Sequence, residues 1–370
     1  MKVPFLDLQP QYVGLRDEIL SAIARVCDSQ RFILGPEVEQ FEAECAATIG
    51  VRHAIGVSSG TDALLVALMA LGIGSGDEVI VPAFSFFATA GSVARLGARP
   101  VFVDVDPTTL MMEADAVRPL IGSRTRAIVP VHLFGLCADM DPLMALATRT
   151  GLAVVEDAAQ GIGATYRGRS AGALGTIGCF SFFPTKNLGA FGEAGLVTTE
   201  DPALAARLRL LRNHGAERRY HHREVGGNFR LDALQAAVLR VKLPHLARWN
   251  DDRRANAAAY GGLFAEAGLD GAVSRPVEPE GRLHTFHQYV VRVPARDRVR
   301  AHLHTREVGS EIYYPVPLDR QECFAPWRPP AEGCPVAQSA AADVLALPIF
   351  PGLTREQQEW VVASLAEVVG

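Results

Sequence analysis

Residues 138–160 read ADMDPLMALATRTGLAVVEDAAQ, in which a helix-length segment precedes a short apolar run that ends on two carboxylates. Residues 138–150 have the character of a helix, whereas residues 152–156 have the β-branched composition of a buried strand. The same alternation continues through the first two thirds of the chain, which is typical of parallel strands joined by crossover helices. We therefore expect an α/β fold with a largely parallel central sheet that helices cover on both faces.

A change in character near residue 243 divides the chain into two parts. The polar, alanine-rich residues 249–265 follow it and predict a long connecting helix. We expect a large domain at residues 1–245, which includes the N-terminal segment, and a small α+β domain at residues 246–370. The large domain should also contain strands at 78–81, 100–105, 127–131, 179–182 and 195–199 and helices at 61–71 and 202–213. The small domain should contain a strand at 287–293 and helices at 299–305 and 355–368.

The composition argues against several classes of protein. The 370 residues carry a net charge of −5 without a basic face interleaved with aromatics, so we expect no nucleic-acid partner. The start of the chain lacks the apolar stretch of a signal peptide, and no later segment has the apolar length of a transmembrane helix. We therefore expect a cytoplasmic protein without a membrane partner. No Cys-x-x-Cys pair occurs, and the adjacent His221 and His222 lack further ligands, so we expect no metal site.

Ligands of α/β sheets bind beyond the carboxyl ends of the strands, which directs attention to Asp157. Residues 154–160, VVEDAAQ, deliver two carboxylates to a strand end, and the strand alternation points Glu156 and Asp157 in opposite directions. An aspartate at such a place can hold a protonated heteroaromatic nitrogen. Taken alone, a solvated or helix-capping aspartate explains the motif more often.

A lysine follows another strand, in residues 180–189, FSFFPTKNLG. Among aromatics and glycines, partial loss of water would lower the pKa of the Lys186 amine and make the amine nucleophilic. A solvated surface position is the usual fate of a single lysine, so this motif too is ambiguous alone.

A polar turn, residues 57–63 or VSSGTDA, opens an apolar helix. Free backbone N–H groups and hydroxyls at such a helix start form an anion site suited to a phosphate. Ordinary capping of the helix explains the same residues equally well.

In this order, the phosphate turn, the strand-end aspartate and the strand-end lysine resemble the fold-type-I pyridoxal-phosphate enzymes. Specific motifs narrow the resemblance to the DegT/StrS-type nucleotide-sugar aminotransferases across nearly the whole chain. These motifs are VPFLDL (3–8), FILGPEV (32–38), SGTDAL (59–64), GDEVIVP (76–82), EDAAQ (156–160), SFFPTKNLG (181–189) and GNFRLDALQAA (227–237).

The resemblance implies pyridoxal 5'-phosphate as the cofactor, with a role for each matching residue. Lys186 would carry the cofactor, Asp157 would pair with its ring nitrogen, and Gln160 would contact its phenolic oxygen. Phe86 would stack on the ring. Phosphate contacts would come from Gly60, Thr61 and Ser181, and from Asn228 of a second subunit. The resemblance therefore implies a homodimer with shared active sites.

The resemblance also implies the substrates, an amino-acid donor, usually L-glutamate, and a nucleotide-linked keto-sugar used in amino-sugar or surface-polysaccharide biosynthesis. Residues 212–222, leading to Arg230, most resemble enzymes acting on UDP-2-acetamido-3-oxo-glucuronate. Basic residues there, His222 and Arg230 among them, could hold a carboxylate or diphosphate. Tyr313 and Tyr314 should also contact substrate, although relatives often carry His where Tyr313 stands, which leaves the exact sugar open.

Two other functions share this fold. A pyridoxal-phosphate sugar dehydratase typically has His in place of the lysine, so Lys186 argues against that reaction. A non-catalytic, cofactor-binding regulator is the second alternative, because a fold alone does not fix a function. The filled catalytic positions argue against the regulator.

Overall fold

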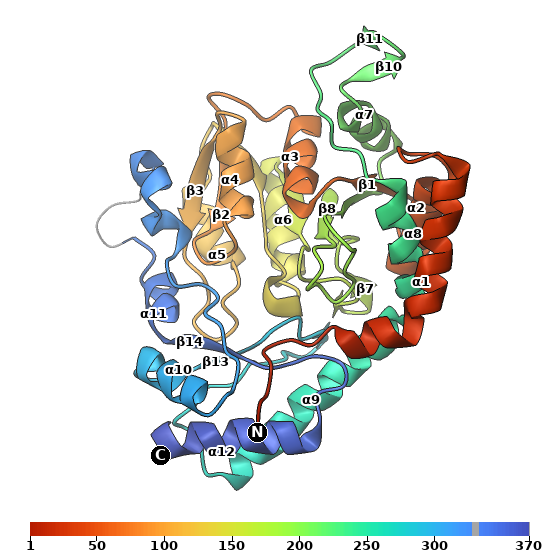
Figure 1. Ribbon diagram of the computed structural model, residues 1–370. Coiled ribbons are helices and arrows are strands. Elements are labelled where there is room, and N and C mark those ends of the chain that lie inside the picture. The colour runs from red at the N-terminus through yellow and green to blue at the C-terminus, as the bar shows by residue number, and fades with distance from the viewer. Residues whose placement is uncertain (328–332, 370) are drawn as a thin grey trace.

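A seven-stranded sheet forms the centre of the computed structural model, which describes residues 1–327 and 333–369 (Figure 1). The strand order is β1-β9-β8-β5-β4-β2-β3. Strand β9 runs antiparallel to β1 and β8, and the remaining neighbours in this sheet are parallel, which confirms the expected architecture. The strands are β1 (His53–Val57), β2 (Glu78–Pro82), β3 (Arg99–Val103), β4 (Thr125–Ile128), β5 (Ala153–Asp157), β8 (Ile177–Ser181) and β9 (Gly195–Thr199).

Helices pack on the sheet through their apolar residues. Helix α3 (Gly60–Ala70) is buried along most of its length, because it lies between the sheet and two further helices, α4 (Ala88–Arg95) and α7 (Pro202–Arg212). A second group, seen along one edge of the sheet in Figure 1, contains α1 (Gln9–Ser29), α2 (Pro36–Ile49) and α8 (Ala233–Lys242). Helix α6 (Met140–Thr150) packs on β5.

The sequence predicted six of the seven central strands to within three residues, and it missed β1. This strand contains Gly56 and starts at the polar His53, so it lacks the continuous apolar run of its neighbours. Glycine is required there by a close contact, since a Cβ on residue 56 would lie 2.8 Å from Cδ2 of Leu231.

The C-terminal part has a hydrophobic core of its own. Its core includes Tyr260, Phe264, Val291, Leu345 and Leu365. The division into domains at residue 245 stays a prediction. The N-terminal Val3 also packs in this core, and Figure 1 shows the N-terminus beside the last helix. The elements are α9 (Leu246–Glu266), β13 (Tyr289–Arg292), α10 (Arg296–Thr305), α11 (Pro335–Asp343), β14 (Val344–Leu347) and α12 (Arg355–Val369), with β13 and β14 antiparallel.

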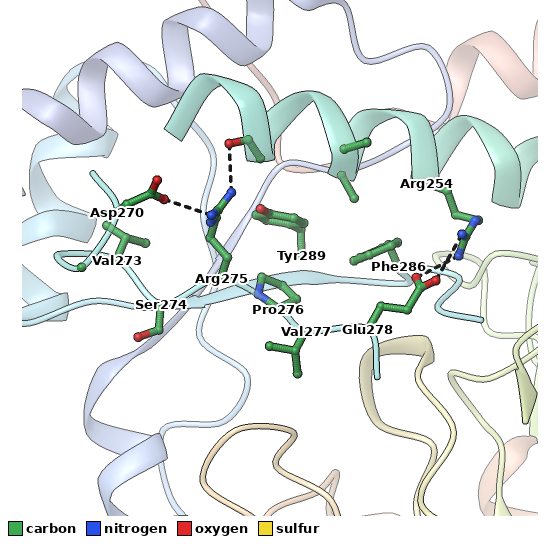
Figure 2. A pocket seen from close by; sticks show the side chains of 14 residues that line it. Arg254, Asp270, Val273, Ser274, Arg275, Pro276, Val277, Glu278, Phe286 and Tyr289 are labelled. Carbon is green, nitrogen blue, oxygen red and sulfur yellow. Dashed lines mark hydrogen bonds and ion pairs between the residues drawn. The ribbon is translucent and has the colours of Figure 1, made fainter. Parts of the chain in front are cut away.

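Helix α9 is joined to the segment that follows it by two arginines, which line a hollow of about 610 Å³ (Figure 2). Arg275 donates to the backbone oxygen of Gly261 at 2.9 Å and pairs with Asp270 at 2.9 Å. Arg254 pairs with Glu278 at 2.9 Å. Each arginine thus has a carboxylate partner, and the two residues hold the segment that follows α9 against that helix. Among the described residues, no helix combines the length and apolarity needed to cross a membrane.

Candidate active site

A cavity of about 550 Å³ lies beyond the carboxyl ends of β5 and β8 and beside the first turn of α3. Strand ends and helix starts meet there because every parallel strand of this sheet ends at the same edge. Nine of the twelve residues expected at the site line it: Gly60, Thr61, Phe86, Asp157, Gln160, Ser181, Lys186, Tyr313 and Tyr314.

The phosphate turn is held rigidly at the start of α3. Ser59 caps the helix, with its Oγ accepting the backbone N–H of Asp62 at 3.0 Å, and the Asp62 carboxylate in turn accepts the hydroxyl of Ser58 at 2.6 Å. Gly60 packs tightly on Ser181, since a Cβ on residue 60 would lie 2.5 Å from Cβ of Ser181. The free N–H groups of the first helical turn therefore lie beside a serine hydroxyl, an arrangement that suits a phosphate.

Asp157 is the buried acid of the cavity. It is 4% exposed, and its carboxylate accepts the Thr89 hydroxyl at 2.7 Å and the backbone N–H of Ala159 at 3.2 Å. Burial raises the pKa of Asp157, while the Thr89 hydrogen bond and the positive charge of Lys186 act in the opposite direction. A cation placed against this carboxylate would therefore favour its ionised form.

Lys186 lies in the segment that leaves β8, where its backbone N–H donates to the carbonyl oxygen of Phe183 at 2.8 Å. Burial lowers the pKa of the Lys186 amine to about 8, although the negative charge of Asp157 partly opposes this shift. A substantial share of the amine is therefore neutral near physiological pH, as a nucleophile or a proton acceptor requires.

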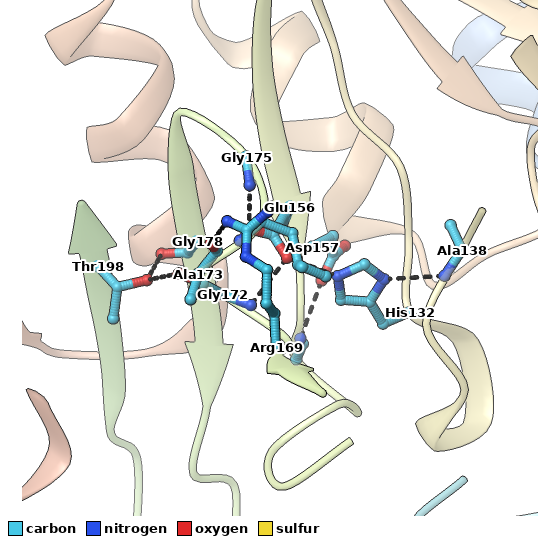
Figure 3. Close-up of polar contacts among 12 residues, drawn as sticks. His132, Ala138, Glu156, Asp157, Arg169, Gly172, Ala173, Gly175, Gly178 and Thr198 are labelled. Carbon is cyan, nitrogen blue, oxygen red and sulfur yellow. Dashed lines mark hydrogen bonds and ion pairs between the residues drawn. The ribbon is translucent and has the colours of Figure 1, made fainter. Parts of the chain in front are cut away.

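Glu156, the neighbour of Asp157 on β5, faces the other side of the sheet, as the strand alternation predicted (Figure 3). It is fully buried and accepts the backbone N–H groups of Gly172 at 2.8 Å and Gly175 at 2.6 Å. Nε2 of His132 lies 2.8 Å from the Glu156 carboxylate. The backbone N–H of Ala138 donates to Nδ1 of His132, so the ring proton sits on Nε2 and points at Glu156. Glu156 is thus occupied in holding the fold.

Aromatic and amide side chains form the opposite wall. Oε1 of Gln160 accepts the backbone N–H of Phe134 at 2.5 Å, and its Nε2 donates to the Tyr314 hydroxyl at 3.1 Å. Among the described residues no further acceptor is bonded to this amide, so its second N–H can serve a ligand. The Phe86 ring is 56% exposed and lies 6.2 Å from the ring of Tyr314, so its face is available to cover a flat ligand.

Three expected residues lie outside this cavity within one chain. Asn228 and Arg230 line a neighbouring hollow, which shares Glu193 with the main cavity. Arg230 donates to the side-chain oxygen of Asn213 at 2.9 Å. His222 lies on the exposed hairpin of β10 (Ala216–Arg218) and β11 (His221–His222), which projects from the body of the molecule (Figure 1).

Three residues that surround the reactive groups, Thr89, His287 and Gln288, were not predicted from the sequence to belong to the site. Thr89 bonds Asp157, and the other two line the cavity directly. Thr89 follows the selected Phe86 by three residues, which is a helical spacing that could have pointed to it. His287 and Gln288 were assigned only to a strand, yet β13 begins after them, at Tyr289.

These residues fit pyridoxal phosphate. The tight contact of Gly60 with Ser181 forms a cradle for a small anion at a helix start. The buried Asp157 offers a carboxylate that a ring N–H⁺ would neutralise. Lys186 lines the same cavity and offers a partly neutral amine for the aldehyde.

Comparison with known proteins agrees with this assignment. Residues 14–366 match the DegT/DnrJ/EryC1/StrS aminotransferase family. The chain is 49% identical to a pleiotropic regulatory protein of Geobacillus stearothermophilus, over 99% of this chain and 98% of that protein. It is also 49% identical to a UDP-N-acetyl-3-dehydro-alpha-D-glucosamine 3-aminotransferase of Acidithiobacillus ferrooxidans, over 99% of this chain and 97% of that one.

A solved structure is similar along its whole length. The crystal structure of S. venezuelae DesV in complex with a ketimine intermediate superimposes with a TM-score of 0.94 and 48% identity, covering 99% of this chain and 98% of that one. Sequence, fold and cavity therefore agree, and the chain belongs to the DegT/DnrJ/EryC1/StrS aminotransferase family, whose members depend on pyridoxal phosphate.

Proposed function

We propose that this protein uses pyridoxal phosphate to move an amino group from an amino acid to the keto group of a nucleotide-linked sugar. L-Glutamate is the proposed donor. The observation that carries the proposal is the presence of Lys186, Asp157 and the start of α3 around one cavity. A cofactor of this size would contact all three at once. The reaction would serve amino-sugar or polysaccharide biosynthesis.

Each residue of the cavity would hold a different part of the cofactor. The first turn of α3, with Gly60 and Thr61, and the hydroxyl of Ser181 would bind the phosphate. Asp157 would hold the ring nitrogen in its protonated form, and the free N–H of Gln160 would donate to the ring oxygen. Once bound, pyridoxal phosphate supplies an electron sink that stabilises a carbanion.

Lys186 would move the proton in both halves of the reaction. Its neutral amine can take a proton from the α-carbon of the donor, and the resulting ammonium can return that proton to a different carbon. A pKa of about 8 suits both roles, because neither the neutral nor the charged form is scarce near physiological pH. Reversal of these steps with the keto-sugar would complete a ping-pong cycle.

We propose a UDP-linked 2-acetamido-3-keto sugar as the acceptor. Support comes from the 49% identity to a relative named for such a substrate, UDP-N-acetyl-3-dehydro-glucosamine, whose sugar has no carboxylate. A 3-oxo-glucuronate would add a carboxylate that needs a cation. Lys186 is the one such cation among the residues of the described chain that line the cavity. Arg230 and His222 of a second subunit would supply further positive charge or hydrogen-bond donors.

A homodimer with shared sites is part of this proposal, since Asn228 and Arg230 do not reach the cavity of their own chain. Mixing Lys186→Ala protein with Arg230→Ala protein tests it. Each variant alone should be nearly inactive. Random exchange of subunits in a two-fold dimer should restore about a quarter of the sites, because half of the dimers are mixed and each has one intact site. No recovery after demonstrated exchange would contradict shared sites.

Addition of glutamate alone to the cofactor-loaded protein separates the transaminase from a regulator. The cofactor's absorbance should convert to that of its amine form without any sugar, and Lys186→Ala should abolish the conversion while the protein stays folded. Absence of conversion with every amino acid would favour the regulator, a function suggested by the name of one 49% identical relative.

Product analysis would identify the acceptor and test the dehydratase. A panel of UDP- and dTDP-linked 3-keto and 4-keto sugars, with and without a C6 carboxylate, should yield an amine from the 3-keto UDP sugars. Loss of water from a sugar without a new amine would instead identify a dehydratase.

A further inference from the structure

Two buried hydroxyl groups connect the start of α4 to the carboxylate of Asp157. Oγ1 of Thr89 donates to Oδ2 of Asp157 at 2.7 Å, and Oγ of Ser85 lies 3.0 Å from the same Oγ1. Thr89 is 1% exposed and Ser85 is 3% exposed. Ser85 lines the cavity, whereas Thr89 does not. Thr89 can therefore act on a ligand in the cavity only through another residue.

These hydrogen bonds run in one direction while Asp157 is ionised. A carboxylate can only accept, so the single hydroxyl proton of Thr89 points to Asp157. The Thr89 oxygen then has no proton to offer to Ser85, and Ser85 must be the donor in the second contact. Because each bond in such a chain polarises the next, the Ser85 hydroxyl strengthens the donor that faces Asp157.

The two oxygens of the Asp157 carboxylate are held in different ways. Oδ1 accepts the backbone N–H of Ala159 at 3.2 Å, which any residue except proline could supply. Oδ2 depends on the Thr89 side chain, because no other donor within residues 1–327 and 333–369 bonds it. Burial raises the pKa of Asp157, and the Thr89 hydrogen bond is the largest of the effects that oppose this rise. One hydroxyl thus orients the carboxylate and favours its charged form.

The turn that enters α4 also connects Thr89 to the aromatic wall of the cavity. The backbone N–H of Thr89 donates to the carbonyl oxygen of Phe86 at 3.3 Å. Ser85 and Thr89 are four residues apart, a spacing that places side chains next to each other on a helical turn. One turn of the chain therefore carries the ring proposed to cover the cofactor and both hydroxyls that lead to Asp157.

We propose that Thr89, supported by Ser85, is a positioning residue of the reaction: its hydroxyl holds the Asp157 carboxylate oriented and ionised, so that the ring proton of the bound cofactor stays on nitrogen. This inference rests on the proposed role of Asp157. A hydrogen bond to a carboxylate stabilises the charged form and makes the carboxylate a weaker base. Without that bond, Asp157 would compete more strongly for the ring proton, and a ring without its proton is a poorer electron sink.

Two matched substitutions separate this role from simple packing. Thr89→Val keeps the branched shape and removes the hydroxyl, whereas Thr89→Ser keeps the hydroxyl and removes a methyl group. A hydrogen-bonding role predicts damage in the valine variant and nearly normal behaviour in the serine variant. A packing role predicts the opposite order, because serine would leave a small cavity at a position that is 1% exposed. Ser85→Ala removes only the outer hydroxyl, so its effect should have the same direction as that of Thr89→Val and be smaller.

The first measurement uses the cofactor-free protein and does not depend on turnover. In protein labelled with ¹³C at the aspartate Cγ, the Asp157 signal is the one that disappears in Asp157→Asn. Its titration should show a higher pKa for Asp157 in Thr89→Val than in wild type, because the charged form has lost a donor. Thr89→Ser should stay close to wild type, and Ser85→Ala should lie between wild type and Thr89→Val.

The second measurement uses protein loaded with pyridoxal phosphate that carries ¹⁵N in its ring. In Thr89→Val the nitrogen signal should shift towards that of an unprotonated ring, and the half-reaction with glutamate should slow by about tenfold or more, with a smaller loss in Thr89→Ser.

Three results would count against the proposal. An unchanged Asp157 titration in folded Thr89→Val would overturn it, and so would a serine variant more impaired than the valine variant. A Ser85→Ala protein that matches wild type in both measurements would refute the supporting role of Ser85. A wild-type protein that binds no pyridoxal phosphate would instead refute the proposed function, and the aspartate titration would still test the contact between Thr89 and Asp157.

Discussion

Gly60 opens helix α3 directly against Ser181, so a methyl group at residue 60 should separate the two parts of the proposed phosphate site. The Cβ of an alanine there would lie 2.5 Å from Cβ and 3.0 Å from Oγ of Ser181. Because carbon atoms in contact prefer about 3.5 Å, the helix end and the serine must move apart by about 1 Å. Neither can move easily, since Gly60 is buried and Ser181 ends β8.

The expected loss of cofactor affinity follows from this displacement. A shift of that size removes at least one charge-assisted hydrogen bond to the phosphate, which contributes about 1.5–3 kcal/mol. Pyridoxal phosphate should therefore bind Gly60→Ala about 10-fold to 150-fold more weakly, at 1.4 kcal/mol for each factor of ten. Crowding at the contact should also reduce the free energy of unfolding by about 1–3 kcal/mol.

Titration of the cofactor-free protein with pyridoxal phosphate, followed by absorbance, measures the affinity. Gly74→Ala is the matched control, because a Cβ at residue 74 meets no atom within 4 Å. Inorganic phosphate should compete with the cofactor in the wild type and less effectively in Gly60→Ala. A folded Gly60→Ala protein that binds the cofactor as tightly as wild type would refute the assignment of this turn to the phosphate.

Three further substitutions test other parts of the structure. Asp157→Asn should bind the cofactor but slow the glutamate half-reaction by about 100-fold or more, measured by stopped-flow absorbance; a wild-type rate would contradict its role at the ring nitrogen. Lys242 is buried with its pKa lowered to about 8, so its charged form penalises the folded state below pH 8, and the penalty fades as the pH rises towards 10.5. When the pH is raised from 7 to 9.5, the free energy of unfolding of wild type, measured with denaturant, should therefore increase by about 2 kcal/mol relative to that of Lys242→Met. A difference in unfolding free energy that does not change with pH would count against the shifted pKa. Gly262→Ala should raise the free energy of unfolding by about 0.5–1 kcal/mol, seen as a higher Tm, because residue 262 is an exposed position within α9 with open space around it.

The parts of the fold that the sequence predicted are those governed by local pattern. Parallel strands that are buried on both faces appear in the sequence as apolar runs, so β2, β5 and β8 could be predicted. The two-residue period of a strand also predicted that Glu156 and Asp157 point to opposite faces of the sheet. Strand β1 was not predicted, because its glycine is explained by a close contact with Leu231, which is far away in the chain. A contact of that kind leaves no periodic signal.

The place of His287 in the cavity wall depends on contacts of the same kind. Its Nδ1 faces Asn187, one hundred residues earlier, and burial, followed by the positive charges of Lys186 and of Arg253 on helix α9, lowers the pKa of the ring. Strand periodicity in fact misdirected the prediction, since it would place residues 287 and 288 on opposite faces. The error lies in the start of β13, and boundaries of short strands are set by tertiary packing more than by propensity.

Residues that the proposed dimer would take from a second subunit are a separate case, because no pattern within one chain identifies them. Asn228 and Arg230 were selected only through the family resemblance, and in one chain they lie in a hollow beside the cavity. The rings of Phe183 and Phe191, which flank Lys186 in sequence, are each 44% exposed. Large apolar side chains exposed on a protein surface can mark an interface with another chain. If a second subunit covers these rings, dimerisation would both exclude water around Lys186 and complete the phosphate site. Any substitution that prevents dimerisation should therefore weaken cofactor binding and, at the same time, raise the pKa of Lys186.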